Sequence, residues 1–413
     1  MRVLVTSWGW RSHFYPLVPM AWALRSAGHE VLVASQPGMT DIITGAGLPA
    51  AAVGEDLDFA EVFSGKIGRV ATRAERARGA TSGEQLPGSV TPAVTADGGV
   101  VRFAAAMLTD LVTLGREFGA DLVLFEPQNL AGAIAAAALG VPGVRQLWGP
   151  DETTQLDLDR PAVLGPLADQ AGVPLADVRL AGDLLLDPCP PGMQVALAAP
   201  STPVRFVPYN GPTVLPDWLR LPPPDRPRVC LTWGTMMASL GIDSKIDLPA
   251  VIAAVAGLDI ELVLALHPAQ HAGLGELPDN VRLPRTPLAL QLVLPSCQAL
   301  VHQGGAGGMM TALAAGVPQV VVPLVSDQHF NAERLVAVGA ALSLPDSAAG
   351  PGQVRGLVAD LLGGTRIPQR AAELAGQVAA MPPPAQVVPV LERLCSEKAY
   401  SSTRTGSLSG APL

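Results

Sequence analysis

Charged residues are scarce in this chain, and positively charged ones are in the minority. Only 15% of its 413 residues are charged, with 27 Lys and Arg against 36 Asp and Glu, and the formal net charge is −9. Nucleic acids and anionic membrane surfaces are bound through basic patches, so this balance argues against both as partners. Nearly half of the residues are apolar, which suits a globular protein with buried sheets.

Paired cysteines and long apolar segments are missing as well. The four cysteines lie far apart and form no Cys-x-x-Cys pair, so the sequence predicts neither a zinc site nor a disulfide framework. No stretch reaches the ~18 apolar residues of a membrane span, and the apolar run over residues 1–7 is too short for a signal peptide. We therefore expect a protein of the reducing cytoplasm.

Apolar strand-like runs alternate with alanine-rich helical segments along the chain, a pattern typical of parallel α/β sheets. The length exceeds what one hydrophobic core usually organises, so two domains are expected. Four strands are predicted in the first half, at residues 2–6, 30–34, 122–125 and 143–147. Four more are predicted in the second half, at residues 228–232, 261–265, 299–302 and 319–322.

A proline-rich segment separates the two halves. Residues 208–227 contain seven prolines, and so many fixed φ angles and missing donors exclude a central strand or helix. We expect an N-terminal domain over residues 1–207, this linker, and a C-terminal domain over residues 228–395 whose last helix is able to pack back on the first domain. Residues 396–413 have little apolar content and are predicted to form a disordered tail.

The segment over residues 300–331 combines, without a break, a strand, a glycine turn, a helix, a second strand and a polar tip. His302 lies at the end of the first strand, and the glycines that follow let the backbone turn and approach a ligand closely: Gly304, Gly305, Gly307 and Gly308. The predicted helix, residues 309–315, presents free N–H groups and the positive end of its dipole to this turn. Such an arrangement binds anions without Lys or Arg, so a pocket for a phosphorylated ligand is predicted.

This segment resembles the donor-sugar signature of the GT-B glycosyltransferases, in particular the GT1-type bacterial enzymes that attach deoxysugars to polyketide, macrolide and enediyne antibiotics. Residues 12–31, 121–142 and 207–219 resemble the same family in the same order, which leaves residues 65–100 and the chain after Cys395 unmatched. The resemblance implies two Rossmann-like parallel-sheet domains that face each other across a cleft. It also implies an inverting enzyme that moves a sugar from a dTDP- or UDP-sugar to a hydroxyl group of a hydrophobic natural product, without a cofactor or metal ion.

The resemblance further implies which residues hold the donor. The diphosphate would be bound by the glycine turn and by the first strand end of the second half, that is, by His302, Gly305, Gly307, Gly308, Met309 and Thr235. Asp327 and Gln328 would contact the sugar hydroxyls, and Leu283 would lie against the nucleotide base.

Some of these residues have structural alternatives or depart from the family. His302 could be a strand-end histidine without a ligand, and Thr235 or Asp327 could cap the helix that follows it. Gly308 stands where the family usually has Thr or Ser, so a hydroxyl group that often contacts the β-phosphate is missing.

On the acceptor side, the resemblance implies that His13 takes the proton from the acceptor hydroxyl, since a neutral imidazole titrates near the working pH. Glu126 occupies the position of the carboxylate that orients this imidazole, where many members have the shorter Asp, and whether it reaches His13 is left open. The acceptor pocket would be built from Trp8, Trp10, Phe14 and residues 65–100. Trp10 and Phe14 are equally good candidates for core residues.

Other classes of function have weaker support in the sequence. Asp-x-Asp triplets at residues 56–58 and 157–159 resemble the metal grip of a different glycosyltransferase fold, but neither follows a convincing apolar strand. A dinucleotide-dependent oxidoreductase is disfavoured because Met310 stands where the third glycine of its fingerprint belongs. A nucleotide-binding auxiliary partner without activity of its own and a homodimer both stay open.

Overall fold

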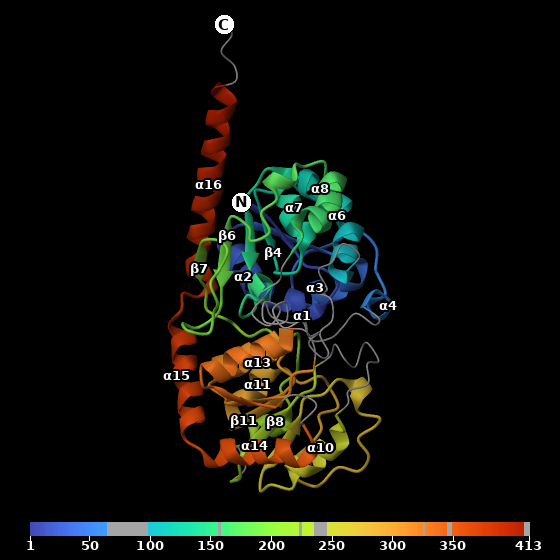
Figure 1. Ribbon diagram of the computed structural model, residues 1–413, viewed down its shortest axis with the longest axis vertical. Helices are drawn as coiled ribbons and strands as arrows, with labels where there is room; N and C mark the ends of the chain where they lie inside the picture. The colour runs from blue at the N-terminus through green and yellow to red at the C-terminus, as the bar shows by residue number, and fades with distance from the viewer. Residues whose placement is uncertain are drawn as a thin grey trace, which may run out of the picture.

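The computed structural model describes residues 1–63, 98–155, 158–222, 225–234, 246–324, 327–344 and 349–408. Within these ranges the chain forms one sheet of seven strands and one of six, and every strand pair is parallel. Figure 1 shows the two sheets with their helices as two units stacked along the long axis of the molecule. The predicted fold class, two Rossmann-like parallel-sheet domains, is confirmed.

The seven-stranded sheet belongs to the first half of the chain and has the order β3-β2-β1-β4-β5-β6-β7. Its strands are β1 (Arg2–Thr6), β2 (Glu30–Ser35), β3 (Ala50–Ala52), β4 (Leu122–Phe125), β5 (Gly143–Gln146), β6 (Leu184–Asp187) and β7 (Ser201–Pro203). Its helices are α1 (Arg11–Phe14), α2 (Val18–Ser26), α3 (Thr40–Gly45), α4 (Phe59–Phe63), α6 (Gly99–Phe118), α7 (Leu130–Leu139) and α8 (Arg160–Ala171). The central strands β1 and β4 are buried almost throughout, because helices cover both faces of a parallel sheet.

The six-stranded sheet belongs to the second half and has the order β10-β9-β8-β11-β12-β13. Its strands are β8 (Arg228–Leu231), β9 (Glu261–Leu264), β10 (Val281–Arg282), β11 (Ala299–His302), β12 (Gln319–Val321) and β13 (Ala341–Ser343). Its helices are α10 (Leu248–Ala256), α11 (Leu290–Val293), α12 (Ala306–Ala315), α13 (Asp327–Ala337), α14 (Pro351–Gly363) and α15 (Arg366–Ala380). In this sheet the order reverses between β8 and β11, as it does between β1 and β4 in the first.

All eight predicted strands are present, each within one residue of its predicted ends. The strands that the sequence pattern does not predict are β3, β6, β7, β10 and β13, and none of them is longer than four residues. The proline-rich segment lies between the sheets, since β7 ends at Pro203 and β8 begins at Arg228.

The last helix, α16 (Pro384–Leu408), returns to the first domain. Val387, Val388 and Leu391 are buried in the same hydrophobic cluster as β1 and α2. Figure 1 shows α15 and α16 running along one side of the molecule, from the second unit to the first. The last helix therefore completes the core of the N-terminal domain, as the sequence allowed.

The tail differs from its prediction. Residues 396–408, expected to be disordered, continue α16, and Lys398 Nζ donates a hydrogen bond to the Val141 carbonyl at 2.8 Å. Residues 409–413 lie outside the described ranges.

The two units meet through apolar and polar contacts. Cys189 and Met193, from the loop after β6, are buried in one cluster with Met309 and Met310 of α12. Arg334 of α13 donates hydrogen bonds to the carbonyl groups of three consecutive residues of this loop, Gly192, Met193 and Gln194. One face of the second domain, formed by α12 and α13, is thus fixed against the first domain.

Candidate active site

The carboxyl ends of the central strands of both sheets meet at this interface. In the first sheet, His13 lies in α1 shortly after β1, and Glu126 directly follows β4. In the second sheet, His302 ends β11, and α12 begins four residues later. A Cβ atom placed on Gly149, just after β5, would lie 3.6 Å from the Ala306 Cβ in the first turn of α12. Parallel α/β sheets bind ligands at the carboxyl ends where the strand order reverses, and these residues occupy that position in both sheets.

The imidazole of His13 and the carboxylate of Glu126 form a pair at this edge. His13 Nδ1 lies 3.3 Å from Glu126 Oε1, and Glu126 is fully buried. The other carboxylate oxygen, Oε2, accepts a hydrogen bond from the Gln128 backbone N–H at 2.6 Å. Among the described residues neither Nδ1 nor Oε1 has a well-aligned hydrogen-bond partner, and catalytic pairs are often misaligned before substrate binds. Glu126 does reach His13, which the sequence left open.

Two indole rings contact this imidazole. Trp8 and Trp148 both meet His13 edge to face, with ring centroids 4.3 Å and 4.5 Å from the imidazole centroid. Because Nδ1 is turned to Glu126, Nε2 is the nitrogen left for an acceptor hydroxyl. Sequence reasoning missed Trp148, whose only signal is an aromatic residue just after β5.

The aromatic residues predicted to bind the acceptor have different surroundings. Trp8 is 3% exposed and packs on Phe103 as well as on His13. Trp10 is half-buried and stacks on Phe59, with centroids 4.4 Å apart. Phe14 is completely buried beside α2 and is a core residue, so it offers no surface to an acceptor. Residues 64–97, which include most of the predicted acceptor loop, lie outside the described ranges.

The turn after β11 depends on Gly304. Its φ is +96°, and a Cβ atom there would lie 3.0 Å from the Gln328 carbonyl oxygen, so the position requires glycine. The Gly304 carbonyl accepts a hydrogen bond from Asn331 Nδ2 at 2.9 Å. The turn is therefore fixed from the side of α13.

The helix after this turn starts earlier than predicted. It begins at Ala306, because Gly305 has extended backbone and its carbonyl accepts the Met309 N–H at 3.0 Å. Gly307 and Gly308 therefore belong to the first helical turn, where backbone N–H groups have no acceptor within the helix. These N–H groups and the positive end of the helix dipole suit a phosphate group.

The imidazole of His302 is buried next to this turn and is hydrogen-bonded to it. It is 1% exposed, and burial lowers its pKa to about 4 against a smaller opposing influence of Gln319, so the imidazole is neutral at pH 7. Its Nδ1 accepts the Gly304 N–H at 3.2 Å. Donation to a phosphate oxygen from Nδ1 would need a proton on that nitrogen, and this role of His302 stays a prediction.

Asp327, the first residue of α13, lies close to the acceptor side. Its Oδ2 accepts a hydrogen bond from Asn331 Nδ2 at 3.2 Å. Burial raises the pKa of Asp327 to about 6, and the His13 imidazole opposes this rise. The predicted sugar-binding carboxylate is therefore electrostatically coupled to the predicted base.

The remaining predicted donor residues are less directly placed. Gln328 is 3% exposed, and its Oε1 accepts the Leu324 N–H at 3.0 Å. Leu283 follows β10 and packs half-buried on the core of the second domain. Thr235 lies outside the described ranges. Donor contacts of these three residues stay predictions.

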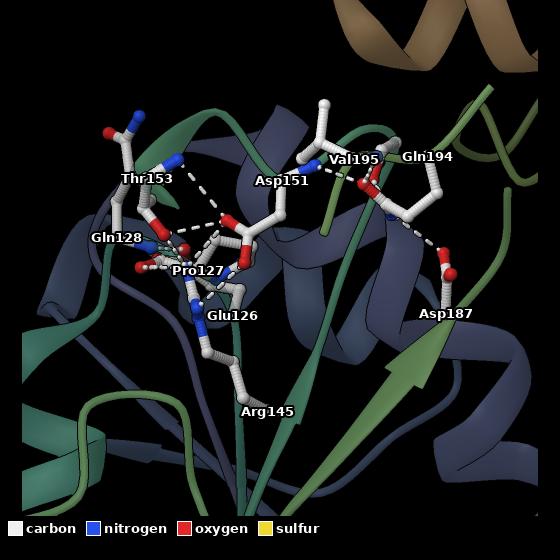
Figure 2. A network of polar contacts seen from close by, with 10 residues as sticks. Glu126, Pro127, Gln128, Arg145, Asp151, Thr153, Asp187, Gln194 and Val195 are labelled. Carbon is white, nitrogen blue, oxygen red and sulfur yellow. Dashed lines mark hydrogen bonds and ion pairs between the residues drawn. The ribbon is translucent and has the colours of Figure 1, made fainter. Parts of the chain in front are cut away.

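Glu152, which sequence reasoning missed, lies in the loop after β5. Its Oε1 accepts a hydrogen bond from Gln128 Nε2 at 2.8 Å. Burial raises the pKa of Glu152 to about 8, and the neighbouring carboxylate of Asp327 adds to the rise. The loop of Glu152 belongs to the polar network around Glu126 in Figure 2. No sequence signal marks Glu152, because its charged neighbour comes from the other domain.

The Asp-x-Asp triplets have structural roles. The Asp56 carboxylate accepts the Gly38 N–H at 2.9 Å and 3.1 Å, Asp58 accepts the Glu61 N–H, and Asp159 caps α8. In the part of the chain that the structure describes, no three His, Cys, Asp or Glu residues cluster in a way that could hold a metal ion. Nor does any helix there have the length and apolar content needed to cross a membrane.

Comparison with known proteins identifies the family. The profile described as "Erythromycin biosynthesis protein CIII-like, N-terminal domain" matches residues 22–234, and the profile of the corresponding C-terminal domain matches residues 249–394. The chain belongs to this family. As a member of the erythromycin biosynthesis protein CIII-like family, it is a glycosyltransferase.

Its relatives in the family match along almost their whole length. Aklavinone 7-beta-L-rhodosaminyltransferase of Streptomyces galilaeus is 38% identical over 99% of both chains. Tylactone mycaminosyltransferase of Streptomyces fradiae is 36% identical over 95% of this chain and 92% of its own.

Solved structures agree with this assignment. Glycosyltransferase VinC in complex with dTDP is 33% identical, with a TM-score of 0.78 over 96% of this chain and 100% of its own. Spinosyn rhamnosyltransferase SpnG complexed with spinosyn aglycone is 31% identical, with a TM-score of 0.76 over 95% of this chain and 100% of its own. The fold is therefore GT-B, and the oxidoreductase alternative has no support.

Proposed function

We propose that this glycosyltransferase transfers a deoxysugar, with inversion, from a dTDP-sugar to a hydroxyl group of a hydrophobic polyketide-type acceptor. The contact between His13 and Glu126 carries this proposal, because it supplies a base at the carboxyl ends of β1 and β4, opposite the first turn of α12. A dTDP-sugar is favoured over a UDP-sugar as donor because two related structures contain thymidine diphosphate, dTDP. The acceptor class follows from relatives named for aklavinone, tylactone and 10-deoxymethynolide.

On the acceptor side, His13 Nε2 accepts the proton of the hydroxyl group as its oxygen attacks the anomeric carbon. Glu126, held by the Gln128 N–H, faces Nδ1 and stabilises the imidazolium that forms. General-base help of this kind typically contributes about 10² to 10⁴ in rate. In this proposal Trp8 and Trp10 line the acceptor pocket, which is supported by the contact of Trp8 with His13 and the stacking of Trp10 on Phe59.

On the donor side, the leaving diphosphate lies against the backbone N–H groups at the start of α12. Each charge-assisted hydrogen bond contributes about 1.5 to 3 kcal/mol, and the helix dipole adds to them. His302 shapes this turn, Thr235 supplies a hydroxyl group to the diphosphate, and the mechanism includes no metal ion. Met309 closes the first helical turn, because its N–H is bonded to the Gly305 carbonyl. Asp327 and Gln328 bind the sugar hydroxyls, and Leu283 lies against the base.

The domain limits follow from these roles. Residues 1–207 bind the acceptor, residues 208–227 link the domains, and residues 228–395 bind the donor. The four cysteines are free thiols, which supports a reducing cytoplasm as the site of action.

Turnover of the His13→Ala variant tests the proposal. A panel of dTDP- and UDP-sugars is combined with aklavinone and tylactone as acceptors, and products are detected by mass spectrometry. We expect transfer from at least one dTDP-sugar, an unchanged dTDP dissociation constant in His13→Ala, and a loss of turnover of about 10² or more. Undiminished transfer by His13→Ala would show that His13 is not the base.

An auxiliary partner is the second candidate, because Gly308 lacks the usual hydroxyl group. A Cβ atom at position 308 would meet only Leu290 at 3.7 Å and His302 at 3.8 Å, so packing does not require glycine there. If the unmodified protein binds dTDP but never turns over alone, and accelerates a second glycosyltransferase, this candidate replaces the first.

A further inference from the structure

Arg145 is a buried cation on β5 that the proposed mechanism does not use. Its side chain is 4% exposed. Its Nη1 lies 3.2 Å from Asp151 Oδ2, and its Nη2 lies 3.2 Å from Asp151 Oδ1, which makes the ion pair bidentate. Burial leaves no room for a substrate to reach the guanidinium, so any effect of Arg145 on the reaction must pass through another residue.

A third acceptor of the guanidinium connects it to the catalytic pair. Nη2 also donates to the Pro127 carbonyl at 3.2 Å. The N–H at the other end of the same peptide group belongs to Gln128, and it donates to Glu126 Oε2 at 2.6 Å. Because a peptide group is planar, its carbonyl and its N–H cannot turn independently. The contact with Arg145 therefore fixes the direction from which Glu126 Oε2 is held.

Further hydrogen bonds hold the ion pair in place. Thr153 Oγ1 accepts from Arg145 Nη2 at 2.6 Å and donates to Asp151 Oδ1 at 2.6 Å. The Asp151 backbone N–H donates to Gln194 Oε1 at 2.9 Å. Figure 2 shows these contacts as one network that links the loop after β4, the loop after β5 and, through Gln194, the loop after β6. The guanidinium thus joins the two loops that follow β4 and β5 at the carboxyl-end edge of the sheet.

We propose that Arg145, held by Asp151, is a positioning residue that sets the Pro127–Gln128 peptide plane so that Glu126 presents Oε1 to His13. This inference rests on the proposed function, in which that pair removes the acceptor proton. Arginine is suited to the role because its rigid fork spans two Asp151 oxygens and the Pro127 carbonyl at once. Lysine is a point charge on a flexible stem and lacks this fork.

The test compares Arg145→Lys with a matched control in the other sheet. Arg228 is also 4% exposed and pairs with Glu261 at 2.6 Å. It is the first residue of β8, at the end of the strands opposite to the glycine turn. With the best donor and acceptor pair from the panel above, Arg145→Lys should lower kcat by about tenfold or more. The dissociation constant for dTDP should stay within about twofold, and Arg228→Lys should leave both quantities within about twofold.

A double-mutant cycle separates positioning from a general structural effect. In a Glu126→Gln background the positioned carboxylate is already gone, so adding Arg145→Lys should lower kcat by less than about twofold. Equal losses in both backgrounds would overturn the inference, and so would an unchanged kcat in Arg145→Lys. If Arg145→Lys does not fold, Thr153→Val removes one acceptor of the guanidinium, keeps both charges, and should show a smaller loss with the same non-additivity. Unchanged kcat in both His13→Ala and Glu126→Gln would instead contradict the catalytic pair of the proposed function, on which this inference rests.

Discussion

Replacing Gly307 with alanine tests the diphosphate site without disturbing the fold. A Cβ atom at this position would have no protein atom within 4 Å, although Gly307 lies in the first turn of α12. Alanine is a better helix former than glycine, so the free energy of unfolding of the variant should be higher than that of the unmodified protein by up to about 1 kcal/mol. If the diphosphate lies against this turn, the added methyl group occupies its place.

The expected loss of affinity follows from the contacts at stake. One charge-assisted hydrogen bond contributes about 1.5 to 3 kcal/mol, which corresponds to a dissociation constant for dTDP raised by about tenfold to a hundredfold. Titration calorimetry with dTDP measures the affinity, and urea unfolding measures the stability. The variant should therefore be more stable and bind more weakly.

Gly352 provides the matched control. It is also the second residue of a helix, α14, and a Cβ atom there would also have no protein atom within 4 Å. Gly352→Ala should raise the free energy of unfolding by a similar amount and leave dTDP affinity unchanged. Equal dTDP affinity in Gly307→Ala and the unmodified protein would refute the assignment of the phosphate site.

Three further predictions concern the residues around this site. Gly308→Ser restores the hydroxyl group usual in the family at a position that has room for a side chain. Calorimetry should therefore show that the variant binds dTDP about tenfold more tightly. Unchanged or weaker binding would count against a β-phosphate at this position. The pKa of Glu152 in the folded protein, about 8, exceeds its unfolded value of 4.5, so its contribution to stability is complete below pH 4.5 and is lost as the pH rises through 8. At pH 9 the free energy of unfolding of Glu152→Gln should therefore be about 1 to 2 kcal/mol higher than that of the unmodified protein. Urea titrations from pH 5 to 9 measure it, with Glu117→Gln, at an exposed position, as an inert control. Parallel pH profiles for all three proteins would contradict the burial of a proton on Glu152. Arg334→Met removes the hydrogen bonds between α13 and the loop after β6. The free energy of unfolding should therefore fall by about 1 to 3 kcal/mol, and the KM for the donor should rise. An unaltered KM would mean that this contact does not hold the domains together.

The main strands could be predicted from the sequence because both faces of each sheet are buried. A strand covered on both faces is a continuous apolar run, as in β4 and β11, and such runs differ clearly from the alanine-rich helices between them. The short strands β3, β7 and β10 have two or three residues and are partly exposed, which is too little for a pattern to appear.

Helix ends were harder to predict than strands. The glycines after His302 have low helix propensity, which favours a late start, yet Gly305 at the N-cap sets the first turn at Ala306. At the other end of the chain, contacts with the first domain, such as that of Lys398, accompany a helix that composition alone does not predict.

The parts of the candidate site that belong to a single chain segment could be predicted from the sequence. The contacts between residues from different segments were harder to predict. The glycine turn is a single segment, and its position after β11 follows directly. The reach of Glu126 to His13 depends on the register of β1 against β4, in which Thr6 pairs with Phe125 and brings both strand ends level. Burial raises the pKa values of Glu152 and Asp327, with a further contribution of Asp327 to that of Glu152, and no local pattern could reveal this.

The most direct test of the phosphate site is a crystal structure of the protein with bound dTDP. We predict that the β-phosphate lies within hydrogen-bonding distance of the backbone N–H groups of Gly307 and Gly308, with its free edge toward His13. A nucleotide bound elsewhere, or a first turn of α12 covered by side chains in that complex, would contradict the assignment of donor and base.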